Sequence, residues 1–392
     1  MKDMLRFLMV TAVVSALVCG FVGCAPEAPT TPTTPTTPTT PTTPTTPTTP
    51  SQPSTETFNW IFQTPYDLIT PYVEMTARTL EEDVLAMSNG RLKIEVMAPN
   101  AIVPAYTEYE AVQEGVLDGG LINPSAKRGV FGATGDLFCQ FPGGPNAVEW
   151  LAWFYSGDGF DLLEEVNDEF GFDDVMPIGC CGPQTAEHAL LTNTKIDSVQ
   201  DFMGLKIRSY GTWGEILQAA GASVVTLPSG EVYESMQRGL IDAFELGDPS
   251  TNWRLHMNEV VDYIYNPGIH SPGSTRTVQV SKDKWSKLPQ DLQLIVSRAL
   301  QAASLEQYNY LLLDSAAAQL QFEDYGCEML DYPLEVQAFI MKACDDAWEK
   351  EAAANPTFAR VLDNQNEFLA KYRSLVQTEP DIAMLREYNA TH

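Results

Sequence analysis

Two stretches of this chain alternate short strands with helices, and this alternation limits the fold more than any other feature. The first stretch has predicted strands over residues 58–63, 91–97 and 119–123, with amphipathic helices over 71–89 and 106–118. The second has strands over residues 205–209, 222–226 and 241–245, with helices over 212–220 and 229–237. Such alternation is typical of parallel sheets covered by helices. The sequence therefore predicts an α/β protein with two lobes, whose cleft is the default ligand site.

Residues 289–323 are predicted to form one long helix, because they contain no glycine or proline after Pro289 and space apolar residues with a helical period. At 1.5 Å per residue this helix would be about 50 Å long, which exceeds one lobe. We therefore expect it to run behind both lobes. A helical tail is expected over residues 334–385, and its exchange between two copies would make a homodimer. The sequence leaves the oligomeric state open.

Residues 1–24 have the features of a secretory signal peptide. Lys2 and Arg6 precede an apolar run over residues 7–22, which is too short for a membrane span and ends at Gly23-Cys24. The sequence around Cys24 resembles a bacterial lipobox, in which the cysteine is lipidated and becomes the mature N-terminus. We therefore expect an extracytoplasmic protein that contacts the membrane through this lipid anchor alone. Cleavage near Cys24 without lipidation is the alternative.

Residues 25–57 are predicted to be a linker, since a strict Pro-Thr-Thr repeat runs from Pro29 to Pro50 and cannot form a core. A glycosylated stalk is the other interpretation of the same residues.

The composition excludes some partners. With 23 basic and 52 acidic residues, the formal charge of −29 disfavours nucleic acid and anionic lipid. A small organic anion would need a local cationic pocket. The cysteines beyond the lipobox lack metal-site spacing, so buried thiols are expected, with one disulfide as the alternative: Cys139, Cys180, Cys181, Cys327 and Cys344.

The segment from Asn193 to Glu245 carries a family resemblance. Its motifs GLKIR, GAS, EVYESMQRG and DAFE occur in the order and spacing of the solute-binding proteins of tripartite ATP-independent periplasmic (TRAP) transporters, the DctP type. The segments AVQEGVLDG from Ala111 and YIYNPGIHSPGS from Tyr263 also resemble this family. The second of them is similar to the branch that binds 2-oxo and 2-hydroxy acids with a metal ion.

This resemblance implies a two-lobed periplasmic-binding-protein fold, type II-like, with a hinge. Lobe I would comprise residues 58–183 with part of 268–320, and lobe II residues 184–267 with part of 321–392. It implies a receptor, not an enzyme, that captures a small organic anion, a 2-oxo or 2-hydroxy monocarboxylate, outside the cytoplasm. The receptor would deliver the acid to the membrane subunits of the transporter.

The resemblance also suggests residue roles. Arg208 stands at the carboxylate-clamping position, where a guanidinium fork matches a carboxylate, and Trp213 would form an apolar wall. Glu245 and the carbonyl of Leu246 would hold the metal ion. A further side-chain ligand would come from Glu187, which has the better spacing to Arg208, with Gln184 as the fallback, although both could instead cap a helix or strand. Carboxylate and carbonyl oxygens favour hard ions such as Na⁺ or Ca²⁺, not Zn²⁺.

Two more residues would close the pocket from the opposite side. They are Asn123 and His270, for which structural hydrogen bonding is an equal alternative. The chain departs from the branch at Leu246, where an aromatic residue is common, and at Asp248-Pro249.

Other functions stay open as alternatives. Glu187 and Glu245 could be an acid/base pair of an enzyme, but the chain lacks a nucleophile elbow, a P-loop, a dinucleotide fingerprint and an HExxH motif. A binding protein of an ABC transporter, or a sensory domain for another organic anion, would share the architecture. The long helix and the motif spacing favour the TRAP family.

Overall fold

The computed structural model describes residues 56–376, which belong to one compact unit of the chain. The predicted signal peptide with the lipidation position Cys24, residues 25–55 of the Pro/Thr-rich linker and residues 377–385 of the predicted tail lie outside the described residues. No helix within residues 56–376 is both long and apolar enough to span a membrane.

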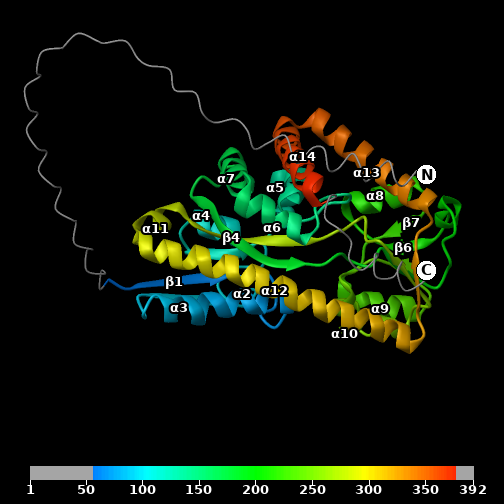
Figure 1. Ribbon diagram of the computed structural model, residues 1–392, viewed down its shortest axis with the longest axis horizontal. Coiled ribbons are helices and arrows are strands. Elements are labelled where there is room, and N and C mark those ends of the chain that lie inside the picture. Colours follow the sequence, from blue (N-terminus) through cyan, green and yellow to red (C-terminus); the bar gives the residue numbers. More distant parts are fainter. Residues whose placement is uncertain (1–55, 377–392) are drawn as a thin grey trace, which may run out of the picture. The chain divides into compact units, whose positions relative to one another are not determined.

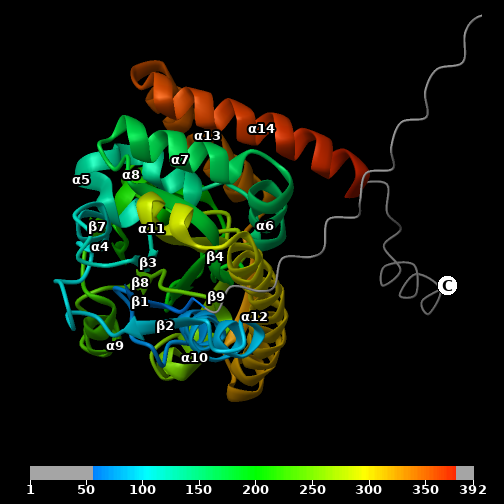
Figure 2. The same cartoon turned by 90° about the vertical axis from the view of Figure 1, so that its left-hand side faces the viewer.

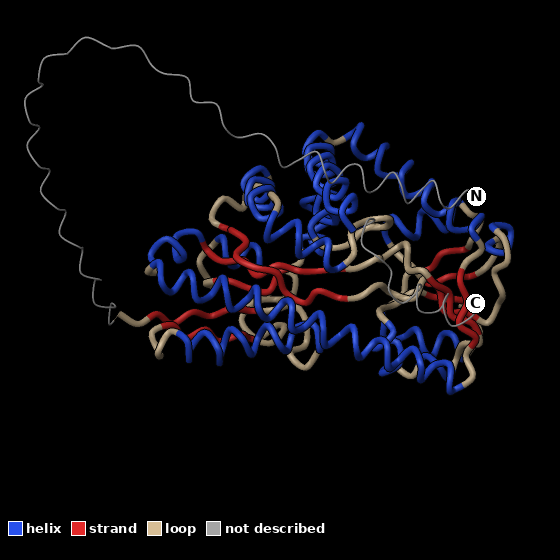
Figure 3. The backbone as a smooth tube through the Cα atoms, viewed as in Figure 1, coloured by secondary structure: helices blue, strands red, loops and turns tan. Residues whose placement is uncertain are grey.

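The strands of the described residues form two sheets, seen as two groups of red segments in Figure 3. The first sheet has the order β2-β1-β3-β10-β4, with β1 (Phe58–Gln63), β2 (Leu92–Met97), β3 (Gly119–Ile122), β4 (Val175–Gln184) and β10 (Ser274–Ser281). The second has the order β11-β9-β5-β8-β6-β7, with β5 (Leu190–Thr192), β6 (Lys206–Arg208), β7 (Ser223–Val225), β8 (Ala243–Phe244), β9 (Tyr263–Asn266) and β11 (Glu328–Asp331).

Both sheets are mixed, which corrects the expectation of purely parallel sheets. Strand β1 pairs in parallel with β2 and β3, but β10 is antiparallel to both β3 and β4. In the second sheet β6 is parallel to β7 and β8, whereas β5 is antiparallel to β8 and β9. The chain leaves the first sheet after β4 and returns to it as β10, which reverses the strand direction there.

Helices cover both sheets. Those that precede β5 are α2 (Pro71–Arg78), the π-helical turn η1 (Thr79–Asp83), α3 (Val84–Met87), α4 (Glu108–Gln113), α5 (Arg128–Phe131), α6 (Ala147–Ser156) and α7 (Gly159–Glu169). Those that follow are α8 (Gly211–Ala219), α9 (Ser229–Gln237), α10 (Pro249–Arg254), α11 (Lys282–Lys287), α12 (Gln290–Tyr325), α13 (Leu334–Ala354) and α14 (Pro356–Val376). Short 3-10 helices are η2 (Pro124–Lys127), η3 (Gly132–Phe138), η4 (Val199–Phe202) and η5 (Met257–Glu259).

The predicted long helix is confirmed as α12, which has 36 residues. It begins after Pro289 and ends at Gly326, whose φ of 110° is a left-handed conformation that favours glycine. It contacts α2 and β4 on one side of the molecule and α10 and β11 on the other (Figure 1). The helix therefore connects both lobes of the predicted two-lobed α/β fold.

The helical tail also touches both lobes. Helix α13 contacts α8 and η4, and α14 contacts α6, α7 and η3. The two views place α13 and α14 on the side opposite α9 and α10 (Figure 2). The tail thus covers both lobes on the side away from α9 and α10.

Candidate ligand and metal site between the two sheets

Two chain segments cross side by side between the sheets. Residues 185–189 lead from β4 to β5, and residues 267–273 lead from β9 back to β10. The backbone N–H of Glu187 donates to the carbonyl of Ser271 at 3.1 Å. A Cβ atom on Gly268 would lie 2.0 Å from the carbonyl oxygen of Glu187, so this approach requires glycine. The crossing therefore brings Glu187 and His270 to one point.

A cluster of two carboxylates and one imidazole forms at this crossing. Ligand atoms of Glu187, Glu245 and His270 all lie within 4.8 Å of one another. The Nε2 atom of His270 is 3.2 Å from Oε2 of Glu187, and Nε2 of Gln140 donates to Oε1 of Glu187 at 3.3 Å. Glu245 comes directly after β8, and both Glu245 and His270 are only 4% exposed. Such a cluster can hold a metal ion.

Arg208 lies behind this cluster, at the end of β6. Its Nη1 donates to the main-chain carbonyl of Glu245 at 2.6 Å and lies 3.5 Å from Oε2 of the same residue. Its Nε donates to the carbonyl of Leu227 at 3.2 Å, and the side chain is buried. The guanidinium therefore fixes the chain that carries Glu245.

The pKa values of the two carboxyl groups are shifted in opposite directions. Burial raises the pKa of Glu245 above its ordinary value, although the charges of His270 and Arg208 act in the opposite direction. Burial also acts to raise the pKa of Glu187, but the hydrogen bond and the charge of His270 outweigh it and lower that pKa. A cation between the two groups would favour the charged form of both.

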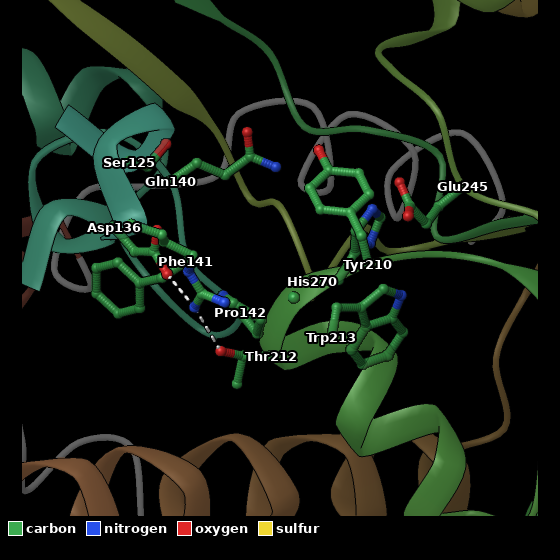
Figure 4. A pocket seen from close by; sticks show the side chains of 12 residues that line it. Ser125, Asp136, Gln140, Phe141, Pro142, Tyr210, Thr212, Trp213, Glu245 and His270 are labelled. Atoms are coloured by element: carbon green, nitrogen blue, oxygen red, sulfur yellow. Dashed lines mark hydrogen bonds and ion pairs between the residues drawn. The ribbon is translucent and has the colours of Figure 1, made fainter. Parts of the chain in front are cut away.

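A cavity of about 260 Å³ opens in front of the cluster. It is lined by Ser125, Arg128, Asp136, Gln140, Phe141, Pro142, Tyr210, Gly211, Thr212, Trp213, Glu245 and His270. Figure 4 shows Ser125, Gln140 and Phe141 on one side of the cavity and Tyr210, Trp213 and Glu245 on the other. Each sheet with its helices therefore contributes one wall.

Some polar atoms at the cavity have no protein partner. Trp213 stacks on His270 with ring centroids 5.3 Å apart. Nε1 of Trp213 and Nδ1 of His270 are buried and find no hydrogen-bond partner within the described residues. Buried polar atoms are normally satisfied, so these atoms are where a bound molecule would be expected.

Five of the residues suggested by the sequence do not line the cavity: Arg208, Glu187, Gln184, Asn123 and Leu246. Oε1 of Gln184 accepts from Nη1 of Arg276 at 2.6 Å and from Oγ of Ser274 at 3.0 Å, which ties it into the first sheet. Asn123 caps η2 through Ser125 and donates to the hydroxyl of Tyr66 at 2.9 Å. The side chain of Leu246 packs against a hydrophobic cluster of the second lobe.

Other lining residues escaped the sequence analysis. Tyr210 follows Arg208 by two residues, and the two-residue period of a strand would have placed both on one side. Arg128 has no such signal. Its Nη2 pairs with Oδ2 of Asp136 at 2.6 Å and donates to Oγ1 of Thr212 at 3.1 Å, which joins the two walls of the cavity.

Comparison with known proteins shows a family relationship. The model of the bacterial extracellular solute-binding proteins, family 7 (DctP), matches residues 69–355. A monocarboxylate 2-oxoacid-binding periplasmic protein of Nostoc sp. is 30% identical over 292 residues, which cover 74% of this chain and 79% of the relative.

Solved structures give the same relationship. A TRAP periplasmic solute-binding protein of Colwellia psychrerythraea, with bound calcium and pyruvate, has a TM-score of 0.74 and 28% identity, covering 85% of this chain and 100% of that chain. A TRAP periplasmic solute-binding protein of Pseudoalteromonas atlantica, with bound sodium and pyruvate, has a TM-score of 0.72 and 25% identity, covering 84% and 99%.

Proposed function

This chain belongs to bacterial extracellular solute-binding protein family 7, the DctP family, and we propose that it captures a small 2-oxo or 2-hydroxy monocarboxylate together with a cation. The observation that carries the proposal is the convergence of Glu187, Glu245 and His270, backed by Arg208, on a cavity between two lobes. The captured acid would pass to the membrane subunits of a TRAP transporter. The relatives that bind pyruvate or 2-oxo acids support this choice of ligand.

Each site residue has a proposed part. Arg208 would bind the carboxylate of the acid with the guanidinium hydrogens that its protein acceptors leave free, and Trp213 would form the apolar wall. Glu187, Glu245 and the carbonyl of Leu246 would hold the cation, whose role is to bind the oxygens of the acid. Gln184 and Asn123 would support the site from behind, since their side chains already bind protein groups.

The residues present fit a cation. Two carboxylates lie close together, the pKa of one of them is raised by burial, and the single guanidinium charge of Arg208 beside Glu245 does not balance both. A bound cation removes that cost and attracts the acid. Na⁺ and Ca²⁺ are the ions bound by the two solved relatives.

We also propose the lobe boundaries expected from the sequence: residues 58–183 with part of 268–320, and residues 184–267 with part of 321–392. The membership of β10 in the first sheet and of β11 in the second supports them. The two crossing segments would then act as the hinge. Lipidation at Cys24 and a homodimer formed through the helical tail remain proposals of the same kind.

Isothermal titration tests the function. The chain is stripped with a chelator, dialysed free of sodium, and titrated with pyruvate, lactate and acetate with and without added CaCl₂, NaCl or ZnCl₂. We expect pyruvate or lactate to bind at one per chain with a cation present, and acetate to bind far more weakly. Absence of binding by every 2-oxo and 2-hydroxy acid tried would contradict the proposal, and turnover of a bound acid would favour the enzyme alternative.

A further inference from the structure

The cluster at the crossing contains a nitrogen ligand, which is unusual for a site that holds a hard cation. Na⁺ and Ca²⁺ take oxygen ligands, whereas imidazole suits Zn²⁺ and the neighbouring transition ions. We propose that His270 is a metal ligand and that this chain selects a divalent transition ion of the Zn²⁺ type. This inference rests on the proposed function, because it concerns the cation of the same site.

The distances suit shared coordination. Ligands bound to Zn²⁺ at about 2.0–2.1 Å lie about 2.8–3.0 Å apart in octahedral geometry and about 3.3–3.4 Å apart in tetrahedral geometry. Nε2 of His270 and Oε2 of Glu187 are 3.2 Å apart. With Glu245 inside the same 4.8 Å group, small side-chain rotations would bring three ligands to one ion.

The surroundings of His270 hold the ring in place for this role. The imidazole is 4% exposed and stacks on Trp213, with an angle of 25° between the rings. Its Nδ1 has no hydrogen-bond partner within the described residues. When Nε2 binds a metal, Nδ1 carries the proton, and it would donate to an oxygen of the bound acid or to water.

The charge of the site favours a divalent ion over a monovalent one. Glu187, Glu245 and a bound monocarboxylate bring three negative charges, and Arg208 supplies one positive charge beside Glu245. Arg128 and Asp136 pair with each other at the other end of the cavity. A divalent ion makes the group neutral, whereas Na⁺ leaves one buried negative charge without a partner.

Three protein ligands leave coordination positions open for the solute. A 2-oxo or 2-hydroxy acid offers a carboxylate oxygen and the oxygen on its second carbon, and these two can bind one ion together in a five-membered chelate ring. A simple carboxylate such as acetate has no oxygen on its second carbon. The structure thus assigns the site to acids that chelate a transition ion.

Cobalt tests the assignment, because Co²⁺ replaces Zn²⁺ and its visible absorption reports its ligands. The full chain is stripped with a chelator, then titrated with Co²⁺ in the spectrometer and with Zn²⁺ and Ca²⁺ in the calorimeter, without any acid present. We expect one Zn²⁺ or Co²⁺ per chain, bound at least tenfold more tightly than Ca²⁺. We expect His270→Gln to weaken Co²⁺ binding at least tenfold and to change Ca²⁺ binding less than threefold.

Two variants serve as controls. His256→Gln changes a histidine whose side chain is 72% exposed on the second lobe, and it should leave both affinities unchanged. Glu245→Gln should weaken both ions. Circular dichroism verifies folding, and His270→Asn replaces His270→Gln if the latter fails to fold.

The outcomes separate this inference from the proposed function. If the wild type prefers Ca²⁺ and His270→Gln leaves the preference unchanged, His270 is only a hydrogen-bond partner of Glu187 and the inference is wrong. Acid binding with Ca²⁺ would then still support the proposed function. If Co²⁺ binds through His270 but no acid binds, the metal site stands and the proposed function fails.

Discussion

Arg208 is buried against Glu245, the residue that is proposed to bind the cation. Its guanidinium holds the main chain of Glu245 at 2.6 Å and faces the carboxylate at 3.5 Å, with 6% of the residue exposed. Because water has little access, no solvent replaces the guanidinium charge when the side chain of Arg208 is removed. A local positive charge matters more here than elsewhere, since the chain has a formal charge of −29.

We expect Arg208→Ala to reduce the affinity for pyruvate about 30-fold or more. Loss of one partner of a buried, hydrogen-bonded charge pair costs about 2–5 kcal/mol. Arg208→Lys should recover only part of the affinity, because a point charge cannot make two parallel hydrogen bonds. Titration calorimetry of folded variants measures this. The matched control is Arg238→Ala, because that side chain is 63% exposed. If the Arg208→Ala variant binds pyruvate within threefold of wild type, Arg208 does not bind the carboxylate.

Glu187 and Gln184 show what the sequence can and cannot decide at the scale of residues. They are three positions apart and both offer an oxygen ligand, so the sequence favoured Glu187 on spacing alone and kept Gln184 as the fallback. In the structure Gln184 is the last residue of β4 and pairs with Ser274 of β10. Glu187 lies beyond the sheet, on the crossing segment. Only the register of β4 against a strand 90 residues later separates the two.

At the scale of elements, the local residue patterns predicted the helices and strands that neighbouring residues determine. Strand β1 and helix α9 have the predicted bounds, whereas α4 is shorter than residues 106–118. It stops near Gly115, whose φ is 73°, and the next backbone N–H groups fold back onto Ala111. The antiparallel insertion of β10 was not predictable, because its neighbours β3 and β4 come about 100 residues or more earlier in the chain.

The contact between α5, η3 and α8 includes a carboxyl group that resists ionisation. Burial raises the pKa of Asp136 from 3.8 to about 6, although Arg128 acts to lower it. The folded state therefore binds this proton more tightly than the unfolded state does. By linkage, this bound proton stabilises the folded state below about pH 4, and the stabilisation is lost as the pH rises from about 4 to about 6.

We expect Asp136→Asn to remove this pH dependence. A difference of about two pKa units corresponds to about 3 kcal/mol. The free energy of unfolding of the variant, relative to wild type, should thus rise by up to about that amount between pH 4 and pH 7. Urea denaturation at both pH values measures it, with the exposed Asp346→Asn as the control. A difference between variant and wild type that is equal at both pH values would show that Asp136 titrates normally.

At the scale of the whole molecule, the tail restricts how the lobes can move. Helix α13 contacts α8, which supplies one wall of the cavity, and α14 contacts η3, which supplies the other. The two helices are separated at Asn355, whose backbone is extended and whose side chain donates to Thr134 of η3 at 3.2 Å. A hinge motion at the two crossing segments would therefore have to bend this junction as well.

Binding of an acid and a cation should close the lobes, because a small ion is held tightly only when both walls cover it. Small-angle scattering of the stripped chain should show a smaller radius of gyration after pyruvate and the preferred cation are added. Arg128→Ala should lessen this contraction, since Arg128 reaches from the wall of Asp136 to Thr212 at 3.1 Å and so stabilises the closed arrangement. Lys350→Ala removes a cation from α13 and should contract as wild type does. An unchanged radius of gyration in the wild type at saturating pyruvate and cation would rule out the hinge and would mean that the acid enters a cavity whose walls are already in place.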